Sequence, residues 1–92
     1  FQMKKIINAA MPLQEKAELL FGKNSAFVEP FIQLYLGDGL MDAVEMLGAQ
    51  ASYEKYSQKF NKAFMADNRK AAMLATNFHQ KIVYQFVLKF KP

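Results

Sequence analysis

The sequence predicts an all-α protein that folds as a compact antiparallel bundle of four or five helices. Along most of the chain, apolar side chains return every three or four positions, which is the repeat of one helix face. Turn signals such as Gly37-Asp38-Gly39 divide this pattern into segments of helical length. Hydrophobic residues make up 52% of the 92 positions, which suffices for one core, so we expect a single helical domain over residues 3–92.

The first helix is expected over residues 3–21, with Gly22 as its C-terminal stop. Its apolar positions follow a spacing of three and four, at Met3, Ile6, Ala10, Leu13, Ala17 and Leu20. Pro12 lies inside this pattern, where it removes a backbone donor and crowds the preceding turn. The sequence therefore predicts a kink near Met11, or a split into two shorter helices that would bring the total to five.

A second helix is expected to run to about Leu36, with Asn24 or Ser25 as its cap. Pro30 is compatible with it, because the amide donors of a first turn have no intrahelical partner.

The third helix is expected to begin at a cap formed by Asp38 and to end at the Asp67-Asn68 pair. Its apolar stripe rotates around Gly48, which predicts a bend there. Asp42 and Glu45 follow the cap, where the positive end of the helix dipole favours carboxylates.

The last helix has the most regular pattern in the chain. Its apolar residues recur every four positions, at Leu74, Phe78, Ile82, Phe86 and Phe90. Residues 81–90 are also rich in β-branched and aromatic side chains, so a strand over that stretch is the alternative.

The residues give no support to catalysis, a cofactor or a metal site. Cysteine is absent, which excludes disulfides, thiolate nucleophiles and Cys-bound metals. His79 is the only histidine, no carboxylate lies within two helical turns of it, and it lacks the Lys-Gly pair that follows the histidine of phosphotransfer domains. There is no Gly-rich phosphate loop, and the carboxylates are interpreted as caps and solvated faces. We expect a protein that is not an enzyme.

No apolar stretch approaches the roughly 18 residues of a membrane span, and without cysteine the expected setting is cytoplasmic. Phe1 and Gln2 precede a Met-Lys-Lys opening and are interpreted as a remnant of recombinant expression.

Charge is unevenly distributed along the sequence. Residues 1–48 contain four lysines and six acids, a net charge of −2, whereas residues 49–92 contain eight basic residues and two acids, a net charge of +6. Lys55, Lys59 and Lys62 are spaced four and three apart, so they share one stripe of the third helix. Such a stripe either serves solubility alone or meets an anionic partner.

These features predict a small non-catalytic protein-binding module, such as a regulator, adaptor or inhibitor. An apolar and aromatic helix face would support homo-oligomers, and the basic C-terminal half would meet an acidic protein partner. The candidate partner-binding residues lie on the third helix and at the start of the last one: Tyr53, Lys55, Tyr56, Lys59, Lys62, Arg69 and Lys70.

Two alternatives belong to other classes. The lysine-rich face could contact nucleic-acid phosphates, with little base specificity because Arg69 is the only arginine. The last helix, with Phe86, Lys89, Phe90 and Lys91, could lie on an anionic membrane surface, which is the less favoured interpretation.

Overall fold

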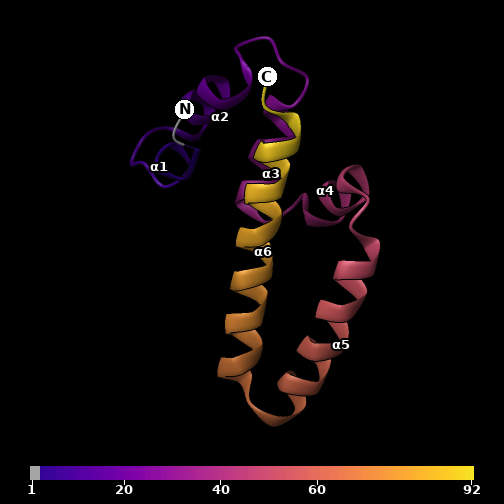
Figure 1. The fold of residues 1–92 in the computed structure, drawn as a ribbon. Coiled ribbons are helices and arrows are strands. Elements are labelled where there is room, and N and C mark those ends of the chain that lie inside the picture. Colours follow the sequence, from indigo (N-terminus) through magenta and orange to yellow (C-terminus); the bar gives the residue numbers. More distant parts are fainter. Residues whose placement is uncertain (1–2) are drawn as a thin grey trace.

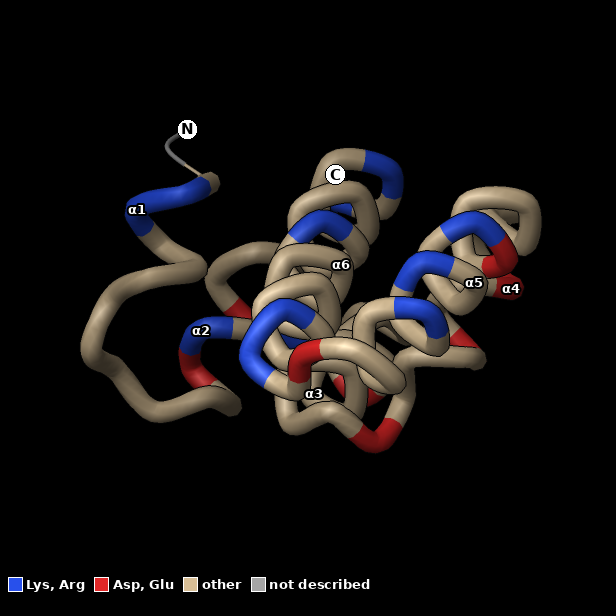
Figure 2. Tube along the Cα trace, turned by 90° about the horizontal axis from the view of Figure 1, so that it is seen from below, with Lys and Arg blue, Asp and Glu red and all other residues tan. Residues whose placement is uncertain are grey.

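The computed structural model describes residues 3–92, which form six α-helices and no strand. The helices are α1 (Met3–Ile7), α2 (Leu13–Phe21), α3 (Val28–Leu36), α4 (Leu40–Leu47), α5 (Gln50–Ala66) and α6 (Asn68–Phe90). The molecule is elongated, with extents of 44 × 27 × 21 Å, and α6 runs along its length (Figure 1). In the view from the α5–α6 turn, α6 lies between α1 and α2 on one side and α5 on the other (Figure 2).

The all-α prediction is confirmed, but the expected number of helices, four or five, is wrong. Pro12 does split the first segment, since α1 ends at Ile7 and Pro12 immediately precedes α2. Gly48 does more than bend the third segment. It adopts a left-handed conformation (φ +64) that ends α4, and α5 begins two residues later. Residues other than glycine rarely adopt this left-handed conformation, because their Cβ atom clashes with the backbone. Glycine lacks a Cβ atom, so it can end the helix here.

The residues at the N-terminal ends of α3 and α4 also differ from the predicted caps. Gly39, and not Asp38, precedes the first turn of α4, and no side chain caps that end. A Cβ on Gly39 would lie 3.0 Å from Cβ of Gln33, so α3 and α4 approach each other closely at this position. Phe27, and not Asn24 or Ser25, precedes α3, although the Ser25 hydroxyl accepts a hydrogen bond from the Phe27 amide at 3.1 Å.

The core surrounds the C-terminal half of α6. Phe86 is fully buried, and its ring centroid lies 5.8 Å from that of Phe21 in α2 and 4.7 Å from that of Phe90. Phe90 in turn stacks on Phe27 at 4.4 Å. Residues 81–90 are helical, so the strand alternative is wrong. Phe86 lies inside the core, and Phe90 is partly covered by Phe27 and Phe86.

One lysine is buried inside the protein. Lys16 is only 4% exposed, and its ammonium group donates hydrogen bonds to the Ile7 carbonyl at 2.6 Å and to the Tyr35 hydroxyl at 3.2 Å. The Tyr35 ring also lies 4.7 Å from this cation. Lys16 thereby joins the C-terminal end of α1, where the helix dipole favours a cation, to α3.

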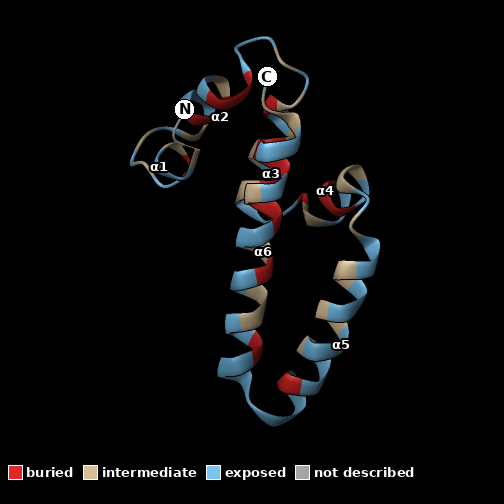
Figure 3. Ribbon diagram, viewed as in Figure 1, coloured by how far each residue is buried: buried red, intermediate tan, exposed pale blue. Residues whose placement is uncertain are grey.

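The far half of the α5–α6 pair extends beyond this core (Figure 3). Ala63 is the one buried residue of α5, and Ala71 is its buried counterpart near the start of α6. Small side chains at these positions let the two helices approach, but they bury little apolar surface. The pair is therefore a projecting helical hairpin, whose surface faces solvent on several sides.

Among residues 3–92, no helix is both long enough and apolar enough to cross a membrane.

Candidate partner-binding groove

A groove runs along one side of the α5–α6 hairpin. On α5, Lys55, Lys59 and Lys62 follow one another at helical spacing, and on α6 the same spacing aligns Lys70 and Lys81 with the apolar Leu74 between them. Two adjoining hollows of about 360 and 410 Å³ make up this groove, and both are lined by Lys59 and Leu74. We call the five lysines Lys55, Lys59, Lys62, Lys70 and Lys81 together with the residues between them the basic groove.

The floor of the basic groove is aromatic. The rings of Tyr56 and Phe78 stack with centroids 4.3 Å apart and planes 5° apart. Tyr53 meets the same Phe78 ring edge-on at 6.0 Å. Burial, with a smaller contribution from neighbouring Tyr53, raises the pKa of the Tyr56 hydroxyl above its ordinary value.

The lysines on the rim of the basic groove have no acidic side chain in the groove lining to offset their positive charge. All five lysines are exposed, and among the described residues none of them makes a hydrogen bond or an ion pair. Residues 49–92 contain only two carboxylates, Glu54 and Asp67, and neither lines the groove. The positive potentials of the lysines therefore add along the groove, which favours an anionic partner.

The structure brings together five of the seven residues predicted from the sequence. Lys55, Tyr56, Lys59, Lys62 and Lys70 line the basic groove.

The other two predicted residues lie elsewhere. Tyr53 packs against Phe78 and the core beneath the groove, while Arg69 is exposed in the first turn of α6 outside the lining.

Sequence reasoning missed the contribution of α6 beyond Lys70. Leu74, Asn77 and Lys81 line the groove, with Phe78 beneath them. Lys70, Leu74, Asn77 and Lys81 are spaced four, three and four apart, so the signal for this face was present. Pairing this face with the α5 face requires the tertiary structure, because the two faces lie on different helices.

His79 lies on another side of α6 and is half-buried. Its Nε2 atom is 2.6 Å from the Leu34 carbonyl oxygen, so that nitrogen carries the proton and donates to the end of α3. Within residues 3–92, no three His, Asp or Glu side chains come together as a metal-binding group. The histidine links α6 to α3.

Comparison of the chain with known protein families, with curated proteins and with solved structures finds no match.

Proposed function

We propose that this protein is a non-catalytic protein-binding module, acting as a regulator, adaptor or inhibitor, whose basic groove receives an acidic amphipathic helix of a partner. One observation supports this above the others. Five lysines without a compensating carboxylate surround an aromatic and aliphatic floor on a pair of neighbouring helices. Such a surface offers charge for selectivity at its rim and apolar area for affinity at its centre.

The spacing of the rim indicates a helical partner. Lys55, Lys59 and Lys62 are separated by about one turn each, which is roughly 4.5 to 6 Å along the helix axis. Carboxylates four and three positions apart on a partner helix repeat at the same distances. Apolar side chains on the neighbouring stripe of that helix would then reach Tyr56, Leu74 and Phe78.

Nucleic acid is the alternative occupant, and the groove favours it less. Arginine, which makes the bidentate contacts typical of base recognition, does not line the groove. Much of the floor is apolar, and a phosphate backbone would leave that floor uncovered. Phe78 is only 7% exposed and covers one face of the Tyr56 ring, so little aromatic surface is left on which a base could stack.

The test is a titration with designed peptides. A labelled helical peptide with Glu at spacings of four and three and Leu on the neighbouring stripe is added to the protein, and fluorescence anisotropy is recorded. We expect saturable binding that weakens with added salt. A peptide with Gln in place of Glu should bind at least about tenfold more weakly, a loss of about 1.4 kcal/mol.

Two protein variants with the same change in net charge locate the site. Lys59→Glu with Lys81→Glu reverses the rim on both helices and should weaken peptide binding by at least about tenfold. Lys5→Glu with Lys23→Glu reverses two exposed lysines outside the groove and should bind the acidic peptide like the wild type. Equal weakening in both variants would mean that only overall charge matters. Binding of a random-sequence DNA duplex without binding of the peptide would overturn the proposal in favour of nucleic acid.

A further inference from the structure

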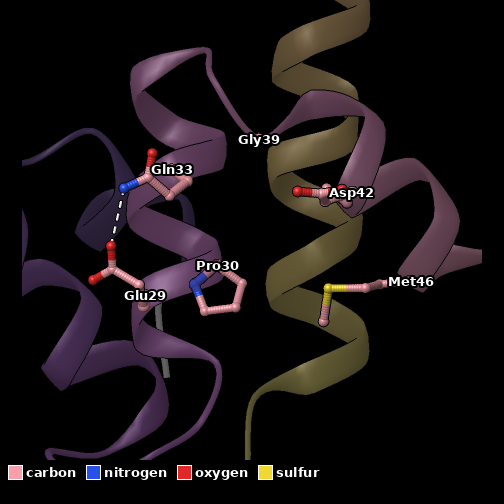
Figure 4. Close-up of a pocket in the computed structure, with 7 residues that line it drawn as sticks. Glu29, Pro30, Gln33, Gly39, Asp42 and Met46 are labelled. Carbon is pink, nitrogen blue, oxygen red and sulfur yellow. Dashed lines mark hydrogen bonds between the residues drawn. The ribbon is translucent and has the colours of Figure 1, made fainter.

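A second surface, independent of the basic groove, lies between α3 and α4. It is a hollow of about 340 Å³, with Glu29, Pro30 and Gln33 on the α3 side and Asp42, Ala43 and Met46 on the α4 side (Figure 4). Pro30 and Met46 give it apolar walls, while the Asp42 carboxylate points from α4 toward α3. We call this surface the acidic hollow.

The acidic hollow is fixed by the backbone. The Gln33 carbonyl accepts hydrogen bonds from the amides of both Asp38 and Gly39, and the close approach at Gly39 holds the start of α4 against the end of α3. Gln33 also donates from Nε2 to the Glu29 carboxylate at 2.9 Å, which orients one of the two acids. Both carboxylates are exposed, and among the described residues neither has a cationic partner.

The end of the α5–α6 hairpin has the opposite character. Met65 and Met73 are 87% and 64% exposed there, beside the exposed cations Lys62 and Arg69. Asp67 also lies at this end, and its carboxylate accepts a hydrogen bond from the Arg69 backbone amide at 3.0 Å. The hairpin end thus presents exposed methionines beside a positive rim, and exposed apolar side chains rimmed by polar groups are typical of interaction surfaces.

These two surfaces carry opposite charges and each includes apolar side chains, but they cannot meet within one chain. The hairpin turn lies at one end of the molecule, whereas α3 and α4 lie in the other half (Figure 1). We propose that the hairpin end of one copy, with Lys62, Met65 and Arg69, docks into the acidic hollow of a second copy, where Glu29 and Asp42 meet its cations and Pro30 and Met46 meet its methionine. Because each copy donates one surface and accepts with another, the association is head-to-tail.

Two variants that each remove one surface provide the test. The hairpin-end variant combines Lys62→Ser, Met65→Ser and Arg69→Ser, and the hollow variant combines Glu29→Lys with Asp42→Lys. All five positions are exposed, so we expect both variants to fold, as circular dichroism would verify. Leu19→Ser with Lys23→Ser is the matched control, because it removes an exposed apolar side chain and a lysine outside both surfaces.

Sedimentation equilibrium at low salt measures the association. The average mass of the wild type and of the control should rise with concentration between about 10 μM and 1 mM, the range of small interfaces. Each variant alone should remain at the mass of one chain. An equimolar mixture of the two should form a complex of two chains that grows no further, because the intact hollow of one variant accepts the intact hairpin end of the other.

A wild type that stays monomeric at about 1 mM would overturn the inference, as would a mixture that gives no complex. Association that both variants retain would place the interface elsewhere. None of these results depends on peptide binding in the basic groove, so the two proposals can fail separately.

Discussion

Replacing Phe78 with leucine tests whether α5 is attached to the molecule mainly through one aromatic contact. Phe78 is 7% exposed and meets two rings of α5, Tyr56 at 4.3 Å and Tyr53 at 6.0 Å. Leucine keeps an apolar side chain at the site but removes both ring pairs. Each such pair contributes about 0.5 to 1.5 kcal/mol beyond its buried area, so we expect a loss of about 2 kcal/mol. For a chain of this size, that loss lowers the melting temperature by roughly 10 °C.

Phe90→Leu is the matched comparison, because Phe90 also meets two rings, Phe27 and Phe86, at the other end of α6. Both substitutions should lower global stability by similar amounts. Only Phe78 lies where α5 opens, so only its substitution should ease the opening of α5 by itself.

Amide hydrogen exchange separates the two effects. Protection of the central α5 amides should fall about 30-fold in Phe78→Leu, which is the exchange equivalent of 2 kcal/mol. In Phe90→Leu the same α5 amides should change by no more than about twofold, while the core amides of α3 and α6 lose protection. If Phe90→Leu exposed α5 as much as Phe78→Leu does, the hairpin would open only with the whole protein, and the reasoning from its thin attachment would be refuted.

Two further changes probe the junctions of α1. Lys16→Ala should cost about 1 to 3 kcal/mol, since the Ile7 carbonyl loses the 2.6 Å bond from the buried ammonium group; thermal melting would show the loss, and unchanged stability would contradict it. Hydrogen bonds from Asn8 and Gln80 lower the pKa of the Tyr84 hydroxyl, so Asn8→Ala with Gln80→Ala should raise it toward the ordinary value, measured by ultraviolet titration with Tyr84→Phe as the control. Because the folded pKa is the lower one, these bonds stabilise the fold fully only above the unfolded value of about 10, and the contribution is lost as the pH falls through the folded pKa.

The helices could be predicted from the sequence because the repeat of apolar side chains is a property of neighbouring residues. The four-residue repeat from Leu74 to Phe90 can be satisfied only by a helix when one side must be buried, and α6 follows it throughout. Pro12 and Gly48 were recognised as interruptions for their backbone properties. A glycine can stay within a bent helix or adopt the left-handed backbone that ends it, and Gly48 does the latter, so two helices stand where a bend was predicted.

The lysines show that local spacing also predicts only part of a binding site. Lys55, Lys59 and Lys62 could be placed on one stripe from their spacing alone, but Lys81 joins them only because α6 returns antiparallel beside α5. Lys16 looked like any other solvated lysine until α1 and Tyr35 enclosed it. Burial of a charged group depends on neighbours distant in sequence, which local spacing does not reveal.

The sequence by itself therefore determined the all-α class, the helical course of residues 74–90 and the opposite charges of the two halves, since side-chain periodicity and composition are local properties. Tertiary structure alone decided that α5 and α6 project as a hairpin, that five lysines line one groove, and that Glu29 and Asp42 line one hollow between α3 and α4. Each of these features joins residues on different helices, and their positions follow from which apolar stripes pair with which in the core.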